Sequence, residues 1–339
     1  MRIAWIDSTK GLAIFGIVLG HFSNIATEWV YLFHLPIFFF LGGVLVYSNN
    51  EVPFFDVVKK KFKSLMWAFY KYSFLLLPYW LFIERFYRPS GEFVQWQYSF
   101  LGLIFANGNQ RFWLSYGGAI WFLPIYFITV ILFDYLLRFF NDLYLVISLF
   151  TILLLGYYFA EFVSFNLPFG ANISFITLFW YGAGYICNKY NLINYLNNAN
   201  SYSLLGITLL LFYFTLQSNL ILDLYSLQFG NNIISLISDT LISIFFIASL
   251  GALLKNLKIL TAMGSASLAI MALHQPIARI MLFIASKLSN VPITVIKNSY
   301  WSVFFCLLVV FVILGLGLIE KRIHKKLNKK YLLRFKLFY

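Results

Sequence analysis

Long apolar runs separated by short polar breaks cover almost the whole chain. They indicate membrane-spanning helices, because a span needs about 20 mainly apolar residues. The fold class that we expect is therefore all-α, a polytopic membrane helix bundle of about ten transmembrane helices. We place the spans at residues 3–22, 35–48, 65–83, 118–137, 143–160, 173–187, 202–222, 233–254, 262–286 and 299–319.

One further apolar run, at residues 98–106, is too short to cross a bilayer. We interpret it as a re-entrant or interfacial segment. The basic residues support this count, since ten spans with both termini cytoplasmic put nineteen of the 25 Lys and Arg residues on the cytoplasmic side. This is the asymmetry of the positive-inside rule, and an eleventh span would spoil it.

Composition agrees with a membrane protein, with 61% hydrophobic residues, 11% charged residues and a mean hydropathy of +0.81. No polar stretch is long enough for a separate soluble domain. We therefore expect one membrane domain at residues 1–320 and a basic cytoplasmic tail at residues 321–339. The tail either anchors the topology or binds anionic lipid headgroups.

The net charge of +13 does not indicate a nucleic-acid partner, because the basic residues lie in the loops and the tail.

Cys187 and Cys306 fall inside apolar runs, where a thiol is usually a packing residue. We expect neither a disulfide nor a metal site.

The first predicted span carries three ionisable residues on one face. At 100° per residue, Lys10 and His21 differ in bearing by only about 20°, and Asp7 lies about 40° from His21. Ile14, Ile17 and Val18 form an apolar wall between Lys10 and His21. The pattern predicts a slot with polar groups at both ends.

Another side of the same helix carries Gly16 and Gly20 in a small-xxx-small arrangement, which allows another helix to approach closely. Gly42 and Gly43, in the second span, likewise indicate helix packing.

Ionisable residues within a span are costly, so a functional role is the first interpretation. Asp7 and Lys10 also have a structural interpretation, as an acidic residue at a helix N-terminus and a lysine that snorkels to the interface. His21, near the outer end, can gain or lose a proton near neutral pH and is a candidate general base. Its alternative role is an interhelical hydrogen bond.

Several other residues are candidates. His34 could touch a substrate or orient His21, or it could be an interfacial residue before the helix that starts near Pro36. Trp121 could anchor at the lipid headgroups or stack on a sugar ring. His274 and Arg279 share one span, where a buried arginine needs a partner or a wet cavity.

The segment WIDSTKGLAIFGIVLGHF, followed by FHLPIFFFLGGVL, resembles the acyltransferase-3 family of integral membrane acyltransferases. GAIWFLPIYF, KKKFK and MGSASLAIMALHQP fit as well, so the resemblance covers nearly the whole chain. It looks closest to the fucose 4-O-acetylase-like branch. The family usually has arginine where this sequence has Lys10, and a lysine offers a point charge in place of a bidentate fork.

The resemblance implies a membrane O-acyltransferase in the bacterial cytoplasmic (inner) membrane. It implies transfer of an acyl group, commonly acetyl from acetyl-CoA, to a hydroxyl of a cell-envelope sugar, a polysaccharide or a lipid-linked sugar. His21 would then be catalytic, with Asp7 setting the local charge. Lys10 and Arg279 would bind the acyl-CoA. His34, Trp121 and His274 would lie at the sugar.

A transporter or flippase of lipid-linked sugars is the main alternative, because a ten-span bundle with a few intramembrane charges suits that role too. A non-catalytic membrane partner in polysaccharide assembly is a third. The sequence contains no glycine-rich phosphate loop, HExxH, GxSxG or CxxC motif, so ATP hydrolysis, zinc proteolysis and serine-hydrolase chemistry have no support.

Overall fold

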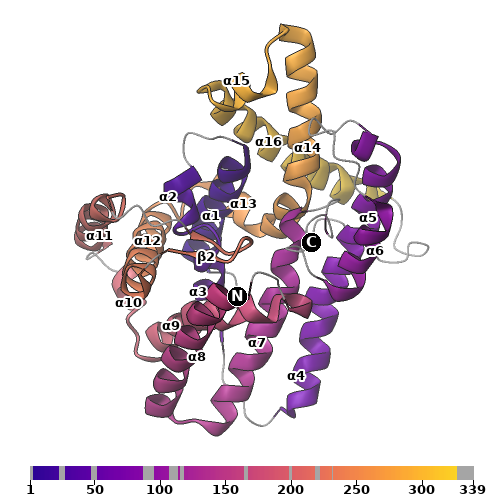
Figure 1. The fold of residues 1–339 in the computed structure, drawn as a ribbon. Helices are drawn as coiled ribbons and strands as arrows, with labels where there is room; N and C mark the ends of the chain where they lie inside the picture. Colours follow the sequence, from indigo (N-terminus) through magenta and orange to yellow (C-terminus); the bar gives the residue numbers. More distant parts are fainter. Residues whose placement is uncertain are drawn as a thin grey trace. The chain divides into compact units, whose positions relative to one another are not determined.

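The computed structural model describes residues 3–22, 27–46, 52–86, 95–106, 114, 118–163, 167–197, 201–217, 222–230 and 232–326, and most of them are helical (Figure 1). The first helices are α1 (Ala4–Phe22), α2 (Thr27–Tyr31), α3 (Pro36–Val44), α4 (Phe54–Lys61), the π-helical η1 (Phe62–Met66), α5 (Trp67–Phe82), the 3-10 turn η2 (Glu84–Phe86) and α6 (Trp96–Phe105). There follow the 3-10 turn η3 (Gly118–Trp121), α7 (Phe122–Phe139), α8 (Asp142–Phe162), the 3-10 turn η4 (Pro168–Gly170), α9 (Ala171–Lys189), α10 (Asn194–Asn197) and α11 (Ser201–Thr215). The last elements are β1 (Leu222–Asp223), β2 (Gln228–Phe229), α12 (Ile233–Leu253), α13 (Lys258–Ser265), α14 (Ser267–Ser289), α15 (Ile293–Lys297) and α16 (Trp301–Lys326).

Every expected span falls largely on helix. Within the described ranges, five helical segments are long and apolar enough to cross a membrane. They are Ala119–Phe139, Asp142–Phe162, Ile233–Leu253, Ser267–Ser289 and Trp301–Glu320. The segments Trp29–Val44 and Tyr202–Thr215 are apolar but shorter.

Two expected spans differ from the structure. The span at 202–222 is too long, because α11 ends at Thr215 and Leu222 already lies in β1. The span at 262–286 is broken at Ala266, which separates α13 from α14.

A small β-hairpin was also not expected in an all-α fold. Leu222 pairs with Phe229, and both side chains are buried. The Asp223 carboxylate accepts hydrogen bonds from the backbone N–H of Tyr225 and Ser226, which closes the turn.

The short apolar run at 98–106 forms α6, which ends where Ala106 adopts a left-handed conformation with φ of 47°. Its ten residues make a helix only about 15 Å long, so the expectation that it is too short to span is confirmed.

At the other end of the chain, α16 continues without a break through the expected domain boundary at residue 320. Residues 327–339 of the basic tail lie outside the described residues.

The chain divides into two compact units. The first comprises residues 1–37, 194–219 and 242–339, and the second comprises residues 38–193 and 220–241. Within the first unit, α1 packs against α13, α14 and α16. Glycines let the backbones meet, because a Cβ at Gly264 would collide with the carbonyl of Asp7 and one at Gly11 with the carbonyl of Leu260. Gly16 and Gly20 pack against Val30, Phe33 and Tyr31, so their expected role in close packing is confirmed.

In the second unit, α7 and α8 both pack against α9, as Figure 1 shows. A Cβ at Gly43 would collide with the carbonyl of Tyr181, and one at Gly184 with the carbonyl of Phe40, so the backbones of α3 and α9 touch. This confirms the packing role of Gly43. Buried hydrogen bonds add to the apolar contacts, among them Thr129 to Thr177 at 2.6 Å.

Candidate active site

The face of α1 that carries Asp7, Lys10 and His21 points into the protein. Ile14, Ile17 and Val18 lie on this face and are 0%, 2% and 0% exposed. From α16, the Cys306 thiol approaches the carbonyl of Val18 at 3.9 Å. The wall of the expected slot is therefore covered along its middle. At its two ends the face is more accessible, since Asp7 and Lys10 are half-buried and His21 is exposed.

At the His21 end of this face, two further histidines gather, and we call His21, His34 and His274 the histidine cluster. The rings of His21 and His274 have centroids 5.3 Å apart and are tilted by 33°. Tyr31 stands between the other pair, 6.5 Å from the His21 ring and 4.6 Å from the His34 ring. Residues more than 200 positions apart in the sequence thus meet at one place.

Local backbone geometry positions His274 within α14. Its Nδ1 lies 2.9 Å from the carbonyl oxygen of Ile270 and 2.8 Å from that of Met271, one turn earlier. Two residues later, Pro276 lacks the N–H that would bond to the carbonyl of residue 272, which loosens the helical ladder next to the histidine.

His34 is held in a similar way. It lies in the turn between α2 and α3, where its Nδ1 is 2.9 Å from the carbonyl oxygen of Val30. Pro36 begins α3, a common position for proline because its missing N–H has no helical partner there. The structure therefore confirms that His34 precedes a helix start.

The three histidines of the cluster differ in their exposure to solvent. His34 is 4% exposed and His274 is 1% exposed, whereas His21 is exposed. Direct contact of a substrate with His34 or His274 therefore does not fit this structure, and His21 is the member of the cluster that a substrate can reach. Within the described residues, no three His, Cys, Asp or Glu side chains are grouped to hold a metal ion.

Asp7 and Lys10 lie at the other end of α1. Asp7 acts electrostatically on Lys10, one turn away. From Asp7 to His21, fourteen residues of helix span about 21 Å. The carboxylate therefore does not reach the ring, and the catalytic assignment of Asp7 has no structural support. Its carbonyl, in contact with Gly264, helps to seat α13 on α1.

Arg279 lies near the histidine cluster and away from Lys10. Gly264, at the end of α13, contacts Asp7, and His274 contacts His21, so α14 runs along α1 in the same direction. Arg279, five residues beyond His274, continues about 7.5 Å further. It hydrogen-bonds Gln275 at 3.3 Å and, with Lys297, acts electrostatically on His21. Of the two residues expected to bind the acyl-CoA, Lys10 therefore lies at one end of this face of α1 and Arg279 beyond the other.

Trp121 belongs to the second unit. It is 8% exposed, and its ring centroid lies 5.5 Å from that of Tyr225 in the β-hairpin turn. A headgroup anchor needs an indole that reaches the lipid interface. The burial of Trp121 against Tyr225 argues for a place inside the protein.

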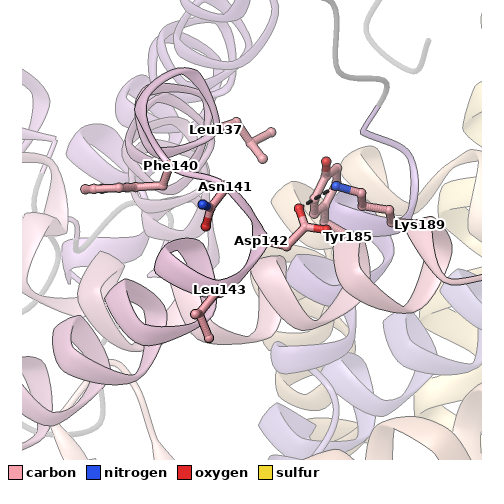
Figure 2. Close-up of a pocket in the computed structure, with 7 residues that line it drawn as sticks. All are labelled: Leu137, Phe140, Asn141, Asp142, Leu143, Tyr185 and Lys189. Carbon is pink, nitrogen blue, oxygen red and sulfur yellow. Dashed lines mark hydrogen bonds and ion pairs between the residues drawn. The ribbon is translucent and has the colours of Figure 1, made fainter.

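The second unit also contains a pocket of about 580 Å³ where the loop between α7 and α8 meets the end of α9 (Figure 2). Asp142 forms an ion pair with Lys189 there, and its other oxygen accepts a hydrogen bond from Tyr190 at 2.7 Å. The hydrogen bond to Asp142 raises the pKa of Lys189 above its ordinary value. Both carboxylate oxygens are thus engaged, and the pair joins two helix ends.

Some members of the site were not found from the sequence. Tyr31 and Lys297 lie near His21 in the fold, but neither carries a local signal, since one is an aromatic and the other a lysine outside the expected spans. The pairing of His274 with His21 was also not found, because helical periodicity says nothing about contacts between distant segments.

An acyltransferase domain model of the acyltransferase-3 family matches residues 3–320. Comparisons with curated proteins and with solved structures found no match. The match covers nearly the whole chain, including all the residues of the histidine cluster. The chain belongs to the acyltransferase-3 family and is a membrane acyltransferase.

Proposed function

We propose that this acyltransferase moves an acetyl group from cytoplasmic acetyl-CoA to a hydroxyl of a cell-envelope sugar or polysaccharide, with His21 as the general base. The observation that carries the proposal is the placement of His21. It is an accessible imidazole at one end of an inward-facing helix face whose other end carries Lys10. Imidazole is well suited to remove a proton from a hydroxyl near neutral pH.

In the proposed reaction, a free nitrogen of His21 takes the proton of the sugar hydroxyl while the oxygen attacks the thioester carbon. A C–O bond forms and the C–S bond breaks. His21 then returns the proton to the departing sulfur, so the products are an acetyl ester and CoA. An acyl-histidine intermediate is the alternative, and it conserves the same atoms.

The donor is proposed to enter at the cytoplasmic end, with the CoA phosphates at Lys10. Eleven residues of helix separate Lys10 from His21 by about 16 Å, which is similar to the reach of an extended pantetheine arm. Because the wall between them is covered, this path requires the side chains over Ile14 and Val18 to move aside.

The remaining candidates take roles that their positions favour. Arg279, beside the histidine cluster, is proposed to face the reacting end of the acyl-CoA and not its nucleotide end. Because Trp121 is buried, we propose that it shapes the acceptor site and does not anchor the protein at the lipid headgroups. A sugar contact with His34 would require its side chain to become exposed.

The topology is also a proposal. We propose ten spans with both termini cytoplasmic, α6 as a re-entrant or interfacial helix, and insertion in a bacterial inner membrane, on the basis of the distribution of basic residues. The fucose 4-O-acetylase-like branch is the proposed subfamily, and lipids around the basic tail are proposed partners.

Replacing Lys10 by alanine is expected to raise the KM for acetyl-CoA about 10- to 100-fold, because a charged hydrogen bond of this kind contributes about 1.5–3 kcal/mol. The turnover number should change little. Steady-state kinetics of the purified full chain measure both. Lys10→Arg is the matched control and should keep most of the affinity. An unchanged KM in Lys10→Ala would remove Lys10 from the donor site.

Ligand-induced stabilisation tests the proposed donor directly. Acetyl-CoA at 100 times its Kd should stabilise the folded chain by about 2.7 kcal/mol, seen as a rise in Tm of the detergent-solubilised protein. CoA should act similarly, and a nucleotide without the pantetheine arm should act less. Indifference to CoA and acetyl-CoA would contradict the proposed donor.

A further inference from the structure

The hydrogen bonds of His274 fix which of its ring nitrogens carries the proton. Its Nδ1 lies within 2.9 Å of two backbone carbonyl oxygens, which can only accept. Nδ1 must therefore carry the hydrogen. In the neutral ring, Nε2 is then an acceptor with an unshared electron pair.

This acceptor is buried and unused. His274 is 1% exposed, and its Nε2 has no hydrogen-bond partner among the residues that the structure describes. A buried acceptor without a partner costs free energy, so such an atom in a native protein calls for an explanation, and a catalytic role is one of them. The ring beside it is that of His21, 5.3 Å away between centroids.

From this geometry we infer that Nε2 of His274 accepts the N–H of His21 in the working enzyme, which makes His274 a positioning residue for the base. A neutral His21 has one N–H and one free nitrogen. When the N–H bonds to His274, the free nitrogen is directed toward the substrate. The same bond stabilises the imidazolium that forms when His21 takes the hydroxyl proton.

Neither the cationic groups near His21 nor the carboxylate on its own helix face can fill this role. Arg279 and Lys297 act on it electrostatically, but their cationic side chains donate hydrogen bonds and do not accept them. Asp7, the carboxylate of the same face, is too far along α1. His274 thus takes the place that a carboxylate holds in other histidine-based sites.

The inference rests on His21 being the base, but its first test needs no acyl transfer. The chain has four histidines, so nitrogen-15 signals of the histidine-labelled full chain in lipid nanodiscs can be assigned by single substitutions. We expect His274 to show the Nδ1–H tautomer and His21 to show one fixed tautomer. An Nε2–H tautomer at His274 in the wild-type protein would overturn the inference, and this measurement needs no variant other than those used for assignment.

Substitution at His274 provides the second test. In His274→Leu, His21 should lose its fixed tautomer, whereas in His274→Gln the amide oxygen replaces Nε2 as acceptor and should preserve it. Unchanged His21 signals in His274→Leu, or a change produced instead by His34→Leu, would contradict the assignment.

Kinetics separate positioning from a purely structural role. His274→Leu should lower kcat about 10- to 100-fold, as expected for a residue that orients a reactive group, with the KM for acetyl-CoA unchanged. His274→Gln should recover most of kcat. The control is His324→Gln, which changes the one histidine outside the cluster, near the C-terminal end of α16. Fixed tautomers in a protein without transferase activity would count against the proposed function alone. An active enzyme whose His274→Leu variant keeps kcat would count against the positioning role alone.

Discussion

Replacing His21 by glutamine should lower acyl transfer by about 10²- to 10⁴-fold, the contribution typical of a positioned general base. Glutamine is similar in size and can hydrogen-bond, but it cannot take a proton from a hydroxyl. Because His21 is exposed, we expect the substitution to leave the packing of the protein intact. Release of CoA in the presence of the envelope glycan measures the loss.

The control for this experiment is donor binding. His21→Gln should retain the Tm of the wild-type protein and its stabilisation by CoA, because Lys10 and its end of α1 are untouched. His324→Gln should be as active as the wild type. Near-normal transfer by His21→Gln would end the assignment of His21 as the base.

Gly43→Ala, which adds a single methyl group, should strongly destabilise the folded protein. Its new Cβ would collide with the carbonyl of Tyr181, which is backbone and cannot rotate away. Forcing α3 and α9 apart breaks contacts in a close-packed interior, and overpacking of this kind costs about 1–3 kcal/mol or more. A fall in the Tm of the purified protein measures it.

Gly206→Ala, in α11, is the matched control, because a Cβ there has no atom within 4 Å. Gly206→Ala changes the helix propensity as Gly43→Ala does, but its Cβ collides with no other atom. Alanine stabilises a helix relative to glycine by about 0.5–1 kcal/mol. Gly206→Ala should therefore be neutral or stabilising. Equal Tm values for the two variants would show that the helices do not touch at Gly43.

The fold followed from the sequence wherever a long apolar run coincides with one helix, as in α7, α8 and α12. The errors lie where the apolar run continues through a change of structure. Ala266 breaks a helix inside an apolar stretch, and the strands of the β-hairpin have two residues each, too few for a periodic pattern to show.

The site was predictable only in part, and for a similar reason. The common bearing of Lys10 and His21 follows from helix geometry, and the inward direction of that face is confirmed by burial. The covered wall and the pairing of His21 with His274 depend on α14 and α16, whose placement comes from tertiary packing. No local pattern in α1 encodes those contacts.

The most direct test of the proposed function is a chemical measurement of acetyl esters on the surface polysaccharide. Cells that make this protein would be compared with cells that lack it and with cells that carry His21→Gln in its place. We expect an ester that is lost without the protein, restored by the wild-type chain and not restored by His21→Gln. The same ester content in all three kinds of cell would contradict the assignment of this protein as an envelope glycan O-acetyltransferase that depends on His21.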